Sequence, residues 1–199
     1  MSKFTPVLCY TALPWEDLGK AAAVFDALRR FHPDWRYVAV IEDTDPPAEK
    51  DAGFEIVAGD RVSFMHQACR QAAVGIVVHI DSHAVVTAAL DPLLAHLEGA
   101  DILLLARMDT PSADRQAVIE RDLHIARSGT FNLAFLAVRT TGAGPALAAW
   151  WADRVGNYPA DIAPPGYAEQ RWLDLAPGLF DGVTIVRQAP MGLELPRDR

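Results

Sequence analysis

The sequence predicts an α/β protein in which helices cover both faces of a mostly parallel, Rossmann-like sheet. Short apolar runs rich in β-branched residues recur along the chain, and they alternate with segments in which apolar residues recur at helical spacing. Most of these runs are apolar at consecutive positions, which is typical of strands buried between two helical layers. Strands that alternate with helices in this way favour a parallel sheet.

The N-terminal third sets the pattern. A first strand is expected at Pro6–Tyr10, with a loop at Thr11–Pro14 leaving it. An amphipathic helix is expected over Trp15–Phe31, because apolar residues recur at helical spacing and Pro33 follows. The second strand, Arg36–Ile41, runs into an acidic, turn-rich loop.

The rest of the chain continues the alternation. Further strands are expected at Phe54–Val57, Ile76–Ile80, Asp101–Ala106, Phe131–Arg139 and Val183–Val186, and helices at Val62–Ala73, Thr110–Arg127, Pro145–Val155 and Tyr167–Leu175. A length of 199 residues without repeats or long linkers suits one domain, which we place at residues 1–189. Residues 190–199 are expected to form a weakly ordered tail.

Composition limits the classes of partner and compartment. The formal net charge is -8 and no cluster of basic residues stands out, which argues against nucleic acid as the main partner but leaves a nucleotide open. No apolar run approaches the length that crosses a bilayer, so no transmembrane segment and a cytoplasmic location are expected. Cys9 and Cys69 match no metal or redox spacing, and we expect them to be buried, reduced thiols.

The strand Ile76–Ile80 carries the first candidate site, because Asp81 and His83 follow it directly. Ligands of open α/β sheets bind outside the carboxyl ends of the strands. If the backbone stays extended, side chains two residues apart point the same way, so Asp81 and His83 would bind one ion together. The alternative is that Asp81 caps a turn and that His83 is an ordinary polar residue.

Three motifs resemble those of the GT-A glycosyltransferases, and in particular the retaining group of glycogenin and the bacterial lipooligosaccharide galactosyltransferases. The first runs from His79 to Val86, where that group has Asp-x-Asp, and continues at Leu90–Leu93 (Leu-Asp-Pro-Leu). The second is Phe131–Arg139, followed by the Trp150–Trp151 pair. The third is Glu169–Phe180, which is similar to a motif that begins Asp-Gln-Arg-Trp.

The resemblance implies a divalent metal that bridges the diphosphate of a nucleotide sugar as a Lewis acid. Asp81 and His83 would be its ligands, and an imidazole ligand suits Mn²⁺ better than Mg²⁺. His83 stands where the group has its second aspartate, and Ala134 and Glu169 stand where it has glycine and aspartate.

The resemblance also implies the other site residues. Thr11 and Asp43 would contact the nucleoside, although both residue types also favour turns. Arg61 would offset diphosphate charge, with a solvated helix face as its alternative. Asn132 would bind the donor sugar.

Two more residues would lie at the reaction centre. The resemblance places Glu169 and Gln170 near the reacting carbon, where a carboxylate stabilises oxocarbenium-like charge or orients the acceptor hydroxyl. The alternative for Glu169 is an exposed residue favoured at a helix start by the helix dipole.

The leading hypothesis is therefore transfer of a sugar from a nucleoside diphosphate sugar, with UDP as the expected nucleotide, to a glycan, a lipid-linked glycan or a protein. The alternative, favoured by the missing acidic residue at position 83 and by a shortened C-terminal part, is a GT-A-like binding module that has lost turnover. Its partners would be a second copy of the chain or an active transferase.

Overall fold

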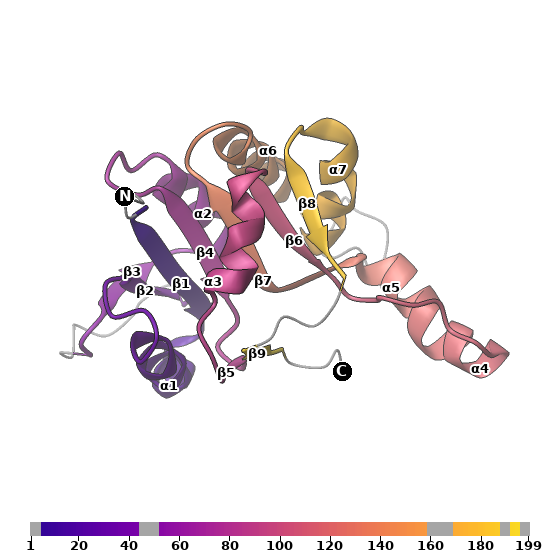
Figure 1. Ribbon diagram of the computed structural model, residues 1–199, viewed down its shortest axis with the longest axis horizontal. Helices are drawn as coiled ribbons and strands as arrows, with labels where there is room; N and C mark the ends of the chain where they lie inside the picture. Colours follow the sequence, from indigo (N-terminus) through magenta and orange to yellow (C-terminus); the bar gives the residue numbers. More distant parts are fainter. Residues whose placement is uncertain (1–4, 44–51, 159–168, 188–191, 196–199) are drawn as a thin grey trace.

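The computed structural model describes residues 5–43, 52–158, 169–187 and 192–195 (Figure 1). Its centre is a seven-stranded sheet in the order β3-β2-β1-β4-β7-β6-β8. Every neighbouring pair is parallel except those made by β7, which runs antiparallel to both β4 and β6. The prediction of a mostly parallel sheet is confirmed.

The strands of this sheet are β1 (Val7–Leu13), β2 (Arg36–Ile41), β3 (Glu55–Ala58), β4 (Ile76–Ile80), β6 (Ile102–Ala106), β7 (Phe131–Arg139) and β8 (Val183–Val186). The α-helices are α1 (Leu18–Arg29), α2 (Arg61–Cys69), α3 (Asp91–Leu94), α4 (Arg115–Ala117), α5 (Leu123–Ser128), α6 (Gly144–Asn157) and α7 (Ala176–Leu179). Turns of 3₁₀ helix occur at Trp15–Asp17, Ala95–Glu98 and Glu169–Leu175, and a π-helical turn occurs at Val118–Asp122.

Helices cover both faces of the sheet, as predicted. One core lies under α1 and α3 and includes Phe25 and Leu93. The other lies under α2, α6 and the 169–175 turn and includes Met65 and Trp151. Each core is filled from alternate residues of the central strands, because successive side chains of a strand point to opposite faces. The two cores explain why these strands are apolar at consecutive positions.

Both cysteines are free and buried in these cores, as predicted. Burial raises the pKa of the Cys69 thiol to about 12, so the group stays neutral. Within the described ranges, no helix is both long and apolar enough to cross a membrane.

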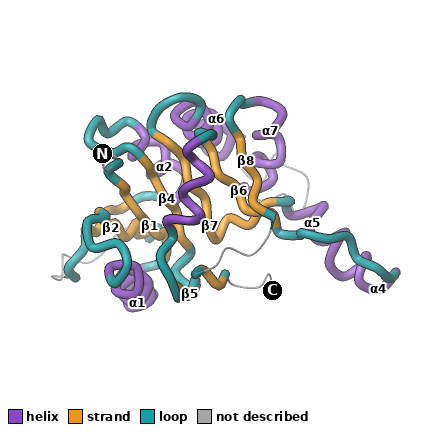
Figure 2. Tube along the Cα trace, in the orientation of Figure 1, coloured by secondary structure: helices purple, strands orange, loops and turns teal. Residues whose placement is uncertain are grey.

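Two expected segments differ from the sequence prediction. The first strand continues to Leu13, so the loop expected at Thr11–Pro14 is wrong. The helix expected over Thr110–Arg127 is broken into α4, the π-helical turn and α5, which project from the sheet as an arm (Figures 1 and 2). Ile125 is the one buried residue of these three helical pieces, and so little packing holds the arm as one regular helix.

The expected weakly ordered tail is also corrected in part. Leu193–Glu194 form strand β9, which pairs antiparallel with β5 (Val85–Val86) just beyond the end of β4. Leu193 is buried in the core under α1. This pairing places a C-terminal segment beside the residues that follow β4.

His32 ties the end of α1 to the start of α3. Its Nε2 accepts a hydrogen bond from the Leu90 backbone N–H at 2.9 Å, and its ring stacks on Trp35 with centroids 3.9 Å apart. Burial lowers the pKa of His32, although the Asp91 carboxylate partly opposes this effect. The proton of the neutral ring must sit on Nδ1, because Nε2 is the acceptor.

The free energy of unfolding is therefore expected to fall as the pH drops below about 6.5, because His32 binds a proton in the unfolded chain but stays neutral in the folded protein. The slope from this residue is at most about 1.4 kcal/mol per pH unit. Burial also lowers the pKa of His79, which adds to the same trend. Urea unfolding between about pH 7.5 and pH 5 measures the slope. His32→Gln, which keeps an acceptor but does not titrate, should reduce the slope and leave the part due to His79, and an unchanged slope would contradict the assignment.

Candidate functional site

The carboxyl edge of the sheet gathers polar residues from segments far apart in the sequence. Asp81 leaves the end of β4, and its backbone N–H donates to the Ala134 carbonyl of β7 at 2.9 Å. Because β7 is antiparallel, its beginning lies at this same edge, and it brings Asn132 there. The reversed strand thus places the second motif beside the first.

Asp81 and His83 lie together at this edge, but a turn joins them, with Asp81 capping it, and not the extended backbone on which the expectation of a shared ion depended. One carboxylate oxygen of Asp81, Oδ1, accepts the His83 backbone N–H at 2.7 Å and lies 3.0 Å from the His83 Nδ1. Their side chains are 31% and 55% exposed, so a ligand has access to both. The tight turn that lets Asp81 accept its neighbour's N–H also directs the imidazole toward the carboxylate.

Lys20, which the sequence reasoning missed, completes this group from helix α1. Its Nζ lies 3.1 Å from the His83 Nε2 and 2.8 Å from an oxygen of Asp17. The contact with Asp81 requires a proton on Nδ1 of His83, which leaves Nε2 as an acceptor for the Lys20 ammonium. The result is a chain of polar contacts from Asp17 through the Lys20 ammonium and the neutral His83 imidazole to Asp81.

The expected divalent metal fits this donor set poorly. Among the described residues there is no group of three or more His, Cys, Asp or Glu side chains that could hold a metal ion. Asp81 and His83 supply two donors, but they face each other, and the Lys20 ammonium occupies the free imidazole nitrogen. The metal therefore stays a prediction that the described residues do not support.

A second polar cluster surrounds Arg61 at the start of α2. The guanidinium forms an ion pair with Glu169, and the Arg61 carbonyl accepts the Tyr10 hydroxyl at 2.8 Å. Desolvation raises the pKa of the neighbouring Glu42, an effect that the Arg61 charge opposes and the Glu169 and Asp60 carboxylates reinforce. Arg61 thus neutralises an acidic cluster, and its contact with a diphosphate stays a prediction.

Hydrogen bonds hold the Glu169 backbone and the Gln170 side chain in place. The Trp151 indole N–H donates to the Glu169 carbonyl at 3.2 Å, and the Gln170 side-chain amide donates to the Ser128 carbonyl at 2.5 Å. The Oδ1 of Asn132 accepts a hydrogen bond from the Ala134 backbone N–H at 2.9 Å, and its NH₂ group remains as a donor for a ligand.

Of the two residues expected to contact the nucleoside, one is buried and the other lies at the carboxyl edge of the sheet. Thr11 lies inside β1 and has no exposed surface, so the prediction that it contacts a nucleotide is wrong for this conformation. The strand runs two residues past it, and that extension buries the side chain. Asp43 does follow β2 at the carboxyl edge, where its Oδ2 accepts the Trp15 backbone N–H at 2.5 Å.

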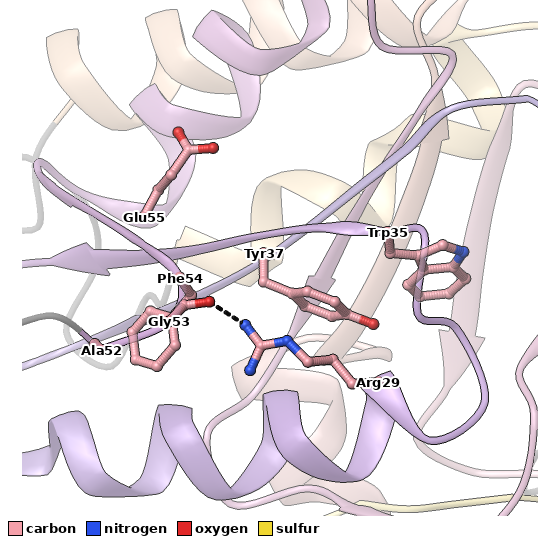
Figure 3. Close-up of a pocket in the computed structure, with 7 residues that line it drawn as sticks. All are labelled: Arg29, Trp35, Tyr37, Ala52, Gly53, Phe54 and Glu55. Carbon is pink, nitrogen blue, oxygen red and sulfur yellow. Dashed lines mark hydrogen bonds between the residues drawn. The ribbon is translucent and has the colours of Figure 1, made fainter.

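An open pocket of about 390 Å³ lies elsewhere, beside the beginning of β2 (Figure 3). Its rim carries the aromatic rings of Trp35, Tyr37 and Phe54. Arg29 also lines it, and its guanidinium lies 5.0 Å from the centre of the Tyr37 ring and donates to the Gly53 carbonyl at 2.6 Å. These contacts are internal to the fold, and none of the predicted site residues lines this pocket.

The comparisons with known proteins bear on the fold. No protein-family model matches the sequence, and no curated protein matches it either. Among solved structures, the chain is similar to the galactosyltransferase LgtC (TM-score 0.58, 13% identity, 89% of this chain and 72% of that one). It is also similar to the glycosyltransferase GlyE of Streptococcus pneumoniae TIGR4 (TM-score 0.57, 14% identity, 92% of this chain and 45% of that one).

A third similar structure is a glycosyltransferase involved in glycosylation of the major capsid of PBCV-1 (TM-score 0.54, 11% identity, 92% of this chain and 82% of that one). The chain spans less than half of the GlyE structure but most of the other two. Identities this low show the architecture and leave activity open. The chain has the GT-A fold of the glycosyltransferases.

Proposed function

We propose that this protein transfers a sugar from a nucleoside diphosphate sugar, with a UDP-sugar as donor, to a hydroxyl acceptor. The observation that carries the proposal is the contact of His83 with both Asp81 and Lys20 at the carboxyl edge of a GT-A sheet, the edge to which the start of β7 also brings Asn132. This edge is where sheets of the α/β type bind their ligands. An accessible cation beside amide and carboxylate groups suits a phosphorylated sugar.

The remaining residues have roles that fit this chemistry. The NH₂ group of Asn132, which has no partner among the described residues, would donate to a hydroxyl of the donor sugar. The Glu169 carboxylate would stabilise the positive charge that develops on the anomeric carbon. Arg61 would act as a positioning residue, since it holds that carboxylate through their ion pair. The Gln170 amide, bonded to Ser128, would fix the segment that carries Glu169.

A binding module without turnover remains a second candidate, and one observation favours it. Arg61 and Gln170 are engaged within the protein, by Glu169 and by the Ser128 carbonyl respectively. Such a protein would bind the nucleotide sugar without releasing UDP. A second copy of the chain or an active transferase stays the predicted partner for that case.

Calorimetric titration with UDP and with UDP-glucose and UDP-galactose, followed by an assay for released UDP, tests the proposal. We expect both classes of ligand to bind and the sugar nucleotides to be turned over. Asn132→Ala should weaken sugar-nucleotide binding about tenfold, the worth of one or two hydrogen bonds, and leave UDP affinity unchanged. Asn157→Ala, at the far end of α6, is the matched control.

The outcomes separate the two candidates. Binding without UDP release, with and without acceptor glycans, would support the module. A folded protein that binds none of these nucleotides would contradict both.

A further inference from the structure

We propose that the site holds the donor's diphosphate without a divalent metal, and that the Lys20 ammonium supplies the neutralising charge. This inference rests on the proposed function and concerns how the same site meets its ligand. It starts from the mismatch between the metal expected from the sequence and the donors that the described residues provide.

The first step concerns the two expected metal ligands, which are committed to each other. Asp81 Oδ1 accepts both the backbone N–H and the Nδ1–H of His83, at 2.7 and 3.0 Å. A divalent ion bound to that oxygen would compete with both hydrogen bonds that set the imidazole orientation. The carboxylate therefore serves to orient His83.

The second step concerns the nitrogen that a metal would use. The Nε2 of His83 points at the Lys20 Nζ, 3.1 Å away. A metal bonded to Nε2 would lie about 2 Å from it and would displace the ammonium, and the two cations would repel each other in this partly covered site. A lysine ammonium thus stands where a metal on His83 would bind.

The third step concerns what Lys20 can still bind. An ammonium has three N–H donors, and the contacts with Asp17 and His83 account for two of them. The Lys20 side chain is 44% exposed, so a ligand can reach the third donor from solvent. A lysine is a flexible point charge that binds phosphate well, and here two neighbours fix its position beside the end of β4.

The test is a calorimetric titration of the full chain with UDP, first in EDTA and then in Mn²⁺, with uridine as the probe that lacks phosphate. We expect the two UDP affinities to agree within about twofold, too small a difference for a bridging metal. Lys20→Met should weaken UDP binding about 10- to 100-fold, as loss of a hydrogen bond between charged groups does, and leave uridine binding unchanged. Lys20→Arg should recover part of the loss, because it keeps the charge.

Arg30→Met is the matched control, since it removes one positive charge from the other end of the same helix. UDP affinity at least about tenfold higher in Mn²⁺ than in EDTA would overturn the inference and leave the proposed function standing. Equal weakening by Lys20→Met and Arg30→Met would also overturn it, because the effect would then be one of net charge. Absence of UDP binding in both solutions would overturn the inference together with the proposed function.

Discussion

Replacing Trp151 with alanine is expected to lower the free energy of unfolding by about 3–5 kcal/mol, the cost of removing a large aromatic side chain from a core. Trp151 is 1% exposed and lies in the core between the sheet, α2 and α6. Its indole N–H also donates to the Glu169 carbonyl, so the substitution leaves a cavity and removes an anchor of the 169–175 turn.

Urea unfolding monitored by circular dichroism measures the loss, and Trp150→Ala is the matched control. Trp150 is half-buried and packs by its edge against Trp172 and Phe180, so its removal should cost less than half as much. Trp151→Phe retains most of the packing and should cost about 1 kcal/mol for the hydrogen bond, plus a small volume term. A loss below about 1 kcal/mol for Trp151→Ala would contradict the placement of this side chain.

Part of the fold was predictable because the sheet is buried on both faces. Strands β2, β4, β7 and β8 have the predicted bounds, because most of their residues are apolar and segments rich in polar and turn-forming residues flank them. The first strand was predicted too short because Thr11 was assigned to a turn. Threonine is β-branched and also favours strands, and Pro14, which has no backbone N–H, marks the true end.

Strand β9 shows the limit of local patterns. Leu193–Glu194 lie in a stretch without apolar periodicity, and they form a strand only because the edge of β5 is available for pairing. That edge lies more than a hundred residues earlier in the chain. Tertiary context decides such pairs, and a single sequence does not display it.

The site, too, has a part that depends on local sequence and a part that depends on tertiary contacts. The contact between Asp81 and His83 is local, because Asp81 caps the turn that follows β4, as the alternative interpretation of the sequence had it. The pairing of Arg61 with Glu169 and the approach of Lys20 to His83 join segments 108 and 63 residues apart. The position of Lys20 near the start of the helix after β1 was visible in the sequence, but nothing there indicated which strand end it would face.

Replacing Glu169 with glutamine is expected to lower the turnover of a sugar nucleotide by about 100-fold or more, in the range of other losses of transition-state stabilisation by a single group. Glutamine matches glutamate in size, so the main change is the loss of the negative charge beside the developing positive charge of the sugar. UDP affinity should change little, because the proposed function places Glu169 at the sugar and not at the phosphates. The effect should thus appear in kcat more than in KM.

The fold should tolerate Glu169→Gln, so a loss of turnover would report on the reaction and not on unfolding. Glu42 and Asp60 still offset the charge of Arg61 when Glu169 is neutral, and the Trp151 bond is to the Glu169 backbone. Glu98→Gln, an exposed carboxylate remote from the carboxyl edge, is the control for the change in net charge. Unchanged turnover in Glu169→Gln would leave that carboxylate only the structural role of pairing with Arg61. The reacting carbon would then have to lie nearer to Asp81, Lys20 and Asn132, at the end of β4.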